Sequence, residues 1–327
     1  MITNFPNGVS SYGAPITGSQ IPFGIGTGGV GDTYFVDPTN GSDGNAGTSP
    51  ETALASISQA NSNVTSNNQD KVVLSANAAH AQTEMLSVSK NRVHFIGTDG
   101  RGGIGMGART RVTLGVTTAA TDLGVMQNTG VGNTFTGMKF DSSNTKAESL
   151  YGVVEAGEYA VYSRCELYKS SDLDDAGASE LALNGDSAQF VDCYIGSTAN
   201  ETGNIRPNVL CTGGIVSGKK LRDCHFFNTF FAGKADDTDK NFVYGANATD
   251  VERSLTFKGC TFFNNPLSSG TPAVAIEFGA AQTQGAVFVD ATTACVDCTV
   301  LGATGQNIFV VSQDGSTYAT AGLAVAA

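Results

Sequence analysis

Hydrophobic and polar positions alternate in a short segment that the chain repeats. In residues 221–227, Leu-Arg-Asp-Cys-His-Phe-Phe, apolar residues stand three positions before and two positions after the Cys, and a polar residue directly precedes it. The aligned central residues are Met138, Cys165, Cys193, Cys224, Cys260 and Cys298. The alternation predicts a strand with one buried face. It also predicts that the five cysteines form one inward-facing column.

The copies recur roughly every 30 residues, which is typical of repeat proteins whose units bury their apolar faces against one another. A unit of this length holds two or three strands and their loops, and we find no helical periodicity between the copies. The pattern therefore predicts an all-β parallel solenoid, in which each strand stacks on the same strand of the next coil about 4.8 Å away. A β-sandwich is the alternative, but its strands alternate in direction and have no reason to repeat one register.

Residues 32–61 are predicted to cap the solenoid, and residues 62–327 to form it. Tyr-Phe-Val-Asp at 34–37 predicts a strand, and the Asn-Gly and Asp-Gly pairs after it predict a tight loop. Ser49 as N-cap, followed by Pro50, predicts a short helix to about Asn61. Because an open solenoid end exposes core and strand edge, this helix is the predicted capping element.

Residues 1–31 contain no Asp, Glu, Lys, Arg or His. Isolated apolar residues recur between Gly, Pro and Ser, which predicts an extended arm that places single side chains into pockets of another surface. The predicted partner-binding residues are Phe5, Val9, Tyr12, Ile16, Ile21, Phe23 and Ile25. The alternative is that the arm folds back along its own solenoid.

The beginning of the chain resembles a known family. The motif Tyr-Phe-Val-Asp, Gly-Ser-Asp and Ser-Pro within residues 34–50 resembles right-handed parallel β-helix proteins of the pectate-lyase-like type. Together with Asn-Phe-Pro-Asn-Gly-Val at 4–9, it resembles virion-associated proteins of tailed bacteriophages. The resemblance covers residues 1 to about 97. At 78–83 the chain reads Ala-Ala-His-Ala-Gln-Thr, where the phage proteins carry Pro-Gly before the His and a Glu after it, so we expect no carboxylate role in this loop.

The resemblance implies a right-handed parallel β-helix with a short N-terminal capping helix and an extended N-terminal arm. It also implies a location in the virion, assembled in the host bacterial cytoplasm. The implied partners are the major capsid protein or another virion protein, and the implied assembly is a homotrimer.

Charge and composition exclude several classes of protein. The formal net charge is −12, which opposes a sequence-independent grip on nucleic acid, so no nucleic-acid partner is predicted. The first residues contain no continuous apolar run and no basic segment, so neither a signal peptide nor a membrane partner is predicted. Cys295 and Cys298 form a Cys-x-x-Cys without a second pair at ligand spacing, so no metal site is predicted. The thiols are predicted to be reduced and buried.

Two acidic clusters are the candidates for chemistry. They comprise Asp172, Asp174 and Asp175 in one insertion and Asp236, Asp237 and Asp239 in another. Glycoside hydrolysis needs two carboxylates, one with a raised pKa, but no apolar residues accompany these clusters, so solvated loops are favoured. Lys234 and Lys240 flank the second cluster, which keeps lyase chemistry open. The three dispersed His and the absence of Trp add no site, so we predict no catalytic residues and no cofactor.

The sequence thus predicts a non-enzymatic structural protein of a bacteriophage virion, a capsid decoration or cement subunit anchored by its N-terminal arm. One alternative is a tailspike-type polysaccharide depolymerase, a glycoside hydrolase or polysaccharide lyase. The other is an adhesin that binds host glycans without cleaving them.

Overall fold

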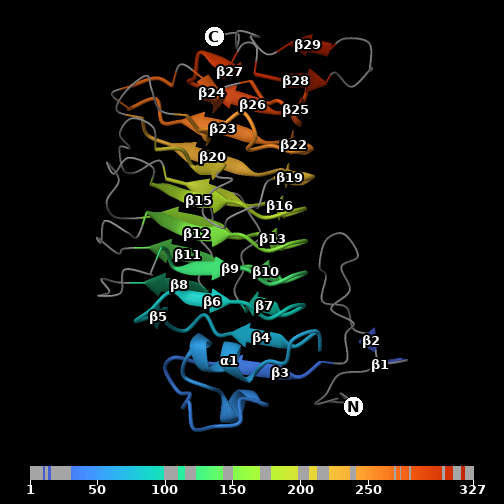
Figure 1. Cartoon of the computed structure of the whole chain (residues 1–327). Helices are drawn as coiled ribbons and strands as arrows, with labels where there is room; N and C mark the ends of the chain where they lie inside the picture. Colours follow the sequence, from blue (N-terminus) through green and yellow to red (C-terminus); the bar gives the residue numbers. More distant parts are fainter. Residues whose placement is uncertain are drawn as a thin grey trace.

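Most strands of the chain stack into three long sheets (Figure 1). The computed structural model describes residues 10–11, 14–15, 31–98, 110–114, 123–142, 150–169, 178–197, 206–211, 221–235, 241–268, 270–272, 274–279, 281–303, 306–311 and 318–320. We call the three sheets sheet 1, sheet 2 and sheet 3, in the order in which each coil visits them. After sheet 3 the chain returns to sheet 1, and each coil stacks on the one before. All described pairings within these sheets are parallel except that of β28 with β29.

Within the described residues, sheet 1 has eleven strands, and sheets 2 and 3 have eight each. Sheet 1 comprises β3 (Thr33–Val36), β4 (Lys71–Leu74), β7 (His94–Gly97), β10 (Thr134–Thr136), β13 (Val161–Ser163), β16 (Gln189–Val191), β19 (Cys224–Phe227), β22 (Ser254–Lys258), β25 (Ala286–Asp290), β28 (Ile308–Val311) and β29 (Tyr318–Thr320). Sheet 2 comprises β5 (His80–Gln82), β8 (Arg111–Leu114), β11 (Lys139–Ser142), β14 (Glu166–Lys169), β17 (Tyr194–Gly196), β20 (Phe230–Gly233), β23 (Thr261–Asn264) and β26 (Ala294–Val296). Sheet 3 comprises β6 (Leu86–Val88), β9 (Met126–Asn128), β12 (Tyr151–Glu155), β15 (Ser179–Leu183), β18 (Val209–Cys211), β21 (Val243–Gly245), β24 (Val274–Phe278) and β27 (Val300–Gly302).

An aromatic ladder from sheet 1 runs through the core. Its rings are Phe95, Phe135, Tyr162, Phe190, Phe226 and Phe257, and each is fully buried. Ring centroids of successive members lie 4.7–5.3 Å apart in stacked orientations. Because coils of a parallel solenoid repeat at the strand spacing, equivalent aromatic residues necessarily stack face to face. The all-β parallel β-helix predicted from the repeat is confirmed.

The column after the corner between sheets 1 and 2 differs from the predicted one. Left-handed residues make this corner, among them Gly137 (φ 65°), Arg164 (φ 53°), Asp192 (φ 53°), Asn228 (φ 46°) and Gly259 (φ 64°). The residue after each turns inward, and where it is a Cys its thiol donates to a backbone carbonyl one coil below. The column is Met138, Cys165, Cys193, Thr229, Cys260 and Thr293.

Cys224 and Cys298 are therefore wrongly placed by the sequence pattern. Cys224 is buried, but it pairs with Leu255 at the start of a sheet 1 strand and follows the corner from sheet 3. That corner also uses left-handed residues, including Asp223 (φ 51°). A polar residue followed by a small buried one thus occurs at both corners. The motif at 221–227 contains the corner from sheet 3 to sheet 1, whereas most of the other copies contain the corner from sheet 1 to sheet 2, so aligning them on the Cys gives the wrong register.

Thr229 provides a test of this register. Its Oγ1 donates to the carbonyl of Phe190 at 3.3 Å, as Cys193 Sγ donates to that of Tyr162 at 3.4 Å. We expect Thr229→Cys to keep the free energy of unfolding within about 1 kcal/mol of wild type, because a thiol has the same partner and similar volume. Thr229→Asp should cost several kcal/mol as a buried carboxylate. Denaturant unfolding checks both, and a Cys variant as damaged as the Asp variant would contradict the register.

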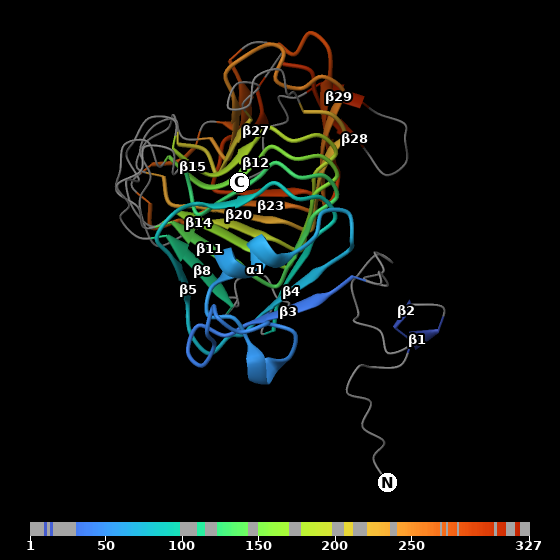
Figure 2. The ribbon, with the colours of Figure 1, turned by 60° about the horizontal axis from the view of Figure 1, so that its bottom comes forward.

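The N-terminal cap forms as two pieces and not as one helix. A 3-10 turn, η1, spans Pro50–Thr52, and α1 spans Ile57–Asn63 with Ser56 as its N-cap accepting from Gln59 N. The predicted start at Ser49 therefore opens only η1, whose backbone ends at Ala53 in an extended conformation. Figure 2 shows α1 lying across the N-terminal end of the coil. Ile57 and Ala60 are buried there, which confirms the short capping helix.

Of the predicted arm, the structure describes only β1 (Ser10–Ser11) and β2 (Ala14–Pro15), which pair antiparallel before Gly31. The seven predicted partner-binding residues lie outside the described residues. Within the described part, no helix is long and apolar enough to cross a membrane.

Candidate functional site

The outer face of sheet 2 carries a row of aromatic side chains. We call Tyr168, Tyr194, Phe230 and Phe263, from four successive coils, the outer aromatic row. All four are partly exposed, and none belongs to the buried apolar clusters. The Tyr194 and Phe230 rings stack at 5.4 Å and 11°, and the Phe230 and Phe263 centroids lie 5.7 Å apart. Tyr194, Phe230 and Phe263 therefore form a continuous aromatic surface outside the core, and Tyr168 lies one coil before them, beside Asp141 and Lys139.

Strand alternation explains why these rings face outward. In each strand the neighbouring apolar residue is fully buried instead: Leu167, Ile195, Phe231 and Phe262. Successive side chains of a strand point to opposite faces, so the inward residue fixes its neighbour outside. A row of partly exposed aromatic rings on an outer face is a candidate binding surface.

Two ion pairs lie next to the row. Arg111 Nη2 is 2.9 Å from Asp141 Oδ2, and Lys139 Nζ is 3.6 Å from Glu166 Oε2. Lys139 Nζ also lies 4.8 Å from the centroid of the Tyr168 ring. The sheet register sets Asp141 beside Tyr168 and Glu166 beside Tyr194. Two carboxylates on adjacent strands thus border the aromatic row.

Asp141 has a carboxylate oxygen in need of a partner. Its side chain is only 5% exposed, and Oδ2 accepts from Arg111. Among the residues that the structure describes, Oδ1 has no hydrogen-bond partner. A buried acceptor without a partner is costly, and such a group in a native protein needs an explanation. This oxygen is also shielded from solvent, so a ligand hydroxyl reaches it only if the neighbouring side chains move.

The histidines do not join this site. His80 begins β5, where the sequence predicted a loop, and its Nε2 lies 2.8 Å from the Ser75 carbonyl. His94 lies between Thr134 Oγ1 at 2.8 Å and Gln69 Oε1 at 2.7 Å. Burial lowers the pKa of His80 and of His94, so both are neutral hydrogen-bonding groups at pH 7. His225, on sheet 1, stacks on Phe227.

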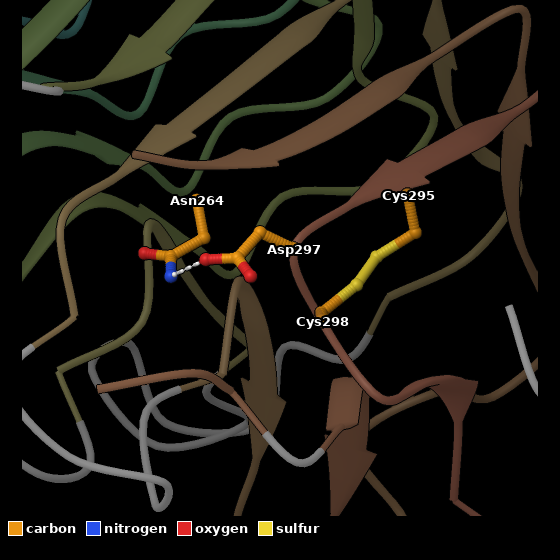
Figure 3. The surroundings of a disulfide bond; sticks show 4 residues. All are labelled: Asn264, Cys295, Asp297 and Cys298. Carbon is orange, nitrogen blue, oxygen red and sulfur yellow. Dashed lines mark hydrogen bonds between the residues drawn. A yellow bond between two sulfur atoms is a disulfide. The ribbon is translucent and has the colours of Figure 1, made fainter. Parts of the chain in front are cut away.

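Cys295 and Cys298 form a disulfide, shown in Figure 3, so the prediction of reduced thiols is wrong for this pair. The strand β26 ends at Val296, between the two cysteines, and Asp297 is left-handed (φ 54°). The turn brings Cys298 back toward Cys295, and Asp297 Oδ2 accepts from Asn264 Nδ2 at 2.8 Å. The other five cysteines are free and buried, and burial raises the pKa of Cys165, Cys224 and Cys260 to about 12. These thiols are unreactive.

Of the residues that the sequence proposed for chemistry, the structure describes only Lys234. Both acidic clusters, at 172–175 and 236–239, and Lys240 lie outside the described residues. No group of three or more metal-ligating side chains occurs within the described ranges. Sequence reasoning missed the aromatic row, although the segments Glu-Leu-Tyr-Lys at 166–169 and Thr-Phe-Phe-Asn at 261–264 carry the signal.

No protein-family model and no curated protein matches the chain. Several solved structures do match the chain. A pectin methylesterase from Aspergillus niger matches with 9% identity and a TM-score of 0.55, over 87% of this chain and 86% of that one. A rhamnogalacturonan lyase matches with 12% identity and a TM-score of 0.55, over 86% and 73%. Geobacillus virus E2 ORF18 matches with 10% identity and a TM-score of 0.37, over 79% and 57%, which is too low to bear on function.

These matches show that the chain shares the parallel β-helix fold of polysaccharide-active enzymes. They contradict the prediction that the chain is not an enzyme, because a methylesterase and a lyase share its fold over most of its length. The absence of Trp was a misleading argument, since Tyr and Phe supply the aromatic surface here.

Proposed function

We propose that the protein is a polysaccharide-active enzyme of the tailspike type, which binds a glycan strand on the outer aromatic row and cleaves it beside Asp141 and Glu166. The observation that carries the proposal is the outer face of sheet 2, where partly exposed rings border two carboxylates. The shared fold of the pectin methylesterase and the rhamnogalacturonan lyase supports it.

The row suits a linear saccharide. The C–H face of a sugar ring packs against the face of an aromatic ring, which buries apolar area and leaves the hydroxyls at the rim for polar groups. Equivalent residues repeat at the coil spacing of about 4.8 Å, close to the length of one sugar ring in a chain. A glycan along the solenoid axis therefore meets Tyr194 and Phe230 in turn, with Tyr168 and Phe263 two residues farther along their own β-strands.

The carboxylates can divide the work of glycoside hydrolysis. In this reaction one carboxylic acid protonates the leaving glycosidic oxygen and one carboxylate takes a proton from the attacking water. Asp141 and Glu166, on adjacent strands at the outer face of sheet 2, are the candidates for these two roles. Water adds across the glycosidic bond, and one new reducing end forms for each bond broken.

A cleavage assay tests the proposal. Pectin, rhamnogalacturonan and bacterial surface polysaccharides are incubated with the protein, and reducing ends are measured. We expect wild type to cleave one of them, and Asp141→Asn or Glu166→Gln to lower the rate about 100- to 10,000-fold through loss of acid or base. The matched control is Asp186→Asn, which removes an Arg-paired acid from the corner between sheets 3 and 1. Equal rates for Asp141→Asn and the control would refute the assignment.

Glycan binding without cleavage is the second candidate, because the aromatic row alone suffices for binding. It predicts that wild type binds a polysaccharide and releases no new reducing ends. A wild-type protein that binds without cleaving is an adhesin, whereas a wild-type protein that cleaves, and whose Asp141→Asn variant binds without cleaving, is the enzyme.

Virion location, association with the major capsid protein or another virion protein, and homotrimer formation are also proposals. They are supported by the resemblance of residues 1 to about 97 to phage virion proteins and by the uncharged segment 1–31. Electron microscopy of a particle that carries the protein tests all three.

A further inference from the structure

A pocket of about 220 Å³ opens at the N-terminal end of the solenoid, remote from the outer face of sheet 2. Phe35 and Val73, on adjacent strands β3 and β4 of sheet 1, form one wall, and Pro50 and Ala53 of the cap form another. Thr98 lines its rim and is exposed. The lining is mostly apolar, so the pocket suits an apolar side chain.

Asp37 is the one charged group in the lining of this pocket, and it does not require a cation. Its Oδ1 accepts from Thr39 N at 2.8 Å and from Asn77 Nδ2 at 2.7 Å, and its Oδ2 accepts from Asn40 Nδ2 at 3.1 Å. Because the carboxylate is already solvated by these donors, an uncharged apolar occupant leaves no charge newly unpaired.

The segment before Gly31 fits this requirement. Residues 1–31 carry no side chain that is charged at pH 7, and Phe23 is the last aromatic residue before the start of β3. Five of the residues between 24 and 31 are Gly, which favours a chain reversal in this stretch. Gly31 itself is fixed beside residues 68–69, since an added Cβ would come within 2.3 Å of the Asn68 carbonyl oxygen.

The reach is sufficient within one chain. Phe35 comes four residues after Gly31, and Phe23 comes eight residues before it. At about 3.3 Å per extended residue, the eight residues span up to about 26 Å, whereas the four residues of β3 cover about 13 Å. A segment that reverses within 26–31 can therefore return along the outer face of sheet 1 as far as the pocket.

We propose that Phe23 docks its ring in the pocket formed by Phe35, Val73, Pro50 and Ala53 of the same chain. The docked segment pins the base of the arm to the cap and orients the residues before it away from the solenoid. This inference does not depend on the proposed function.

The lack of Trp in the chain allows a direct test. In full-length Phe23→Trp, the single indole is expected to show blue-shifted emission and protection from iodide and acrylamide. Adding Thr98→Asp, a charge at an exposed rim position, or Val73→Asp, a charge in the wall, should shift the emission to the red and restore quenching. The matched control is Phe5→Trp, with solvent-like emission that neither charge alters.

Circular dichroism checks that each variant is folded, and the rim variant keeps the test valid if the wall variant unfolds. Indole emission of the Phe23→Trp variant that is solvent-like from the outset, or that ignores both charges, would overturn the proposal. So would protection that disappears on dilution, since docking into a second copy depends on concentration whereas docking within one chain does not.

Discussion

Phe190→Ala is expected to lower the free energy of unfolding by about 3–5 kcal/mol, because it removes a buried ring from the middle of the aromatic ladder. Phe190 is fully buried, and its ring stacks at 4.8 Å on Tyr162 and at 4.7 Å on Phe226. The coils above and below hold the cavity open, so relaxation recovers little of the loss. Urea unfolding followed by circular dichroism measures the effect.

Phe230→Ala is the control for this loss. It removes a ring of the same size from the outer face of the same solenoid, where Phe230 is partly exposed and stacks on Tyr194. We expect a cost of about 1 kcal/mol or less, since the site is already open to solvent. Similar losses for the two variants would mean that the two faces of the coil are assigned incorrectly.

The paired substitution Tyr194→Ala with Phe230→Ala is expected to weaken glycan binding by about 1–3 kcal/mol, roughly ten- to a hundredfold in Kd. The two rings are the closest stacked pair of the outer aromatic row, at 5.4 Å, and Glu166 lies beside Tyr194 in the sheet register. Without them a sugar ring loses its apolar contact, although the nearby carboxylates remain. Titration calorimetry with an oligosaccharide of the polysaccharide that the protein binds measures the loss.

Phe288→Ala with Phe309→Ala is the matched control for binding. These rings also form a stacked, partly exposed pair, at 6.0 Å, but on the outer face of sheet 1. The control pair should leave Kd unchanged. Equal weakening by both pairs would show that general damage, and not loss of a platform, explains the effect.

Much of the fold could be predicted from the sequence, because each coil of a solenoid must bury the same inward-facing positions and therefore repeats the same pattern of apolar residues. Phe135, Tyr162, Phe190 and Phe257 precede their corner residues at a constant spacing, so the ladder is visible as a pattern. The copy at 221–227 could not be placed, because Cys224 follows a different corner that uses the same left-handed turn chemistry. Only the pairing of strands shows that Thr229 takes the place of a cysteine.

The candidate site was missed for a related reason. In Thr-Phe-Phe-Asn at 261–264, the repeat places Phe262, two positions after Cys260, on the buried face and so leaves Phe263 outside, but it does not show that rings of neighbouring coils meet there. Asp141 likewise has no distinguishing feature in the sequence, and only the strand pairing shows that it lies beside Tyr168. The clusters of acidic residues were chosen as candidates instead, because a cluster is visible in the sequence, whereas the side chains that meet across neighbouring strands are not.

The most direct test of the central claim is a crystal structure of the Asp141→Asn variant with an oligosaccharide of the polysaccharide that the protein binds. We predict sugar rings packed on Tyr194 and Phe230, with the strand along the solenoid axis and a hydroxyl within hydrogen-bond distance of the side chain at position 141. An oligosaccharide bound on another face, with the outer aromatic row left open to solvent, would contradict the account.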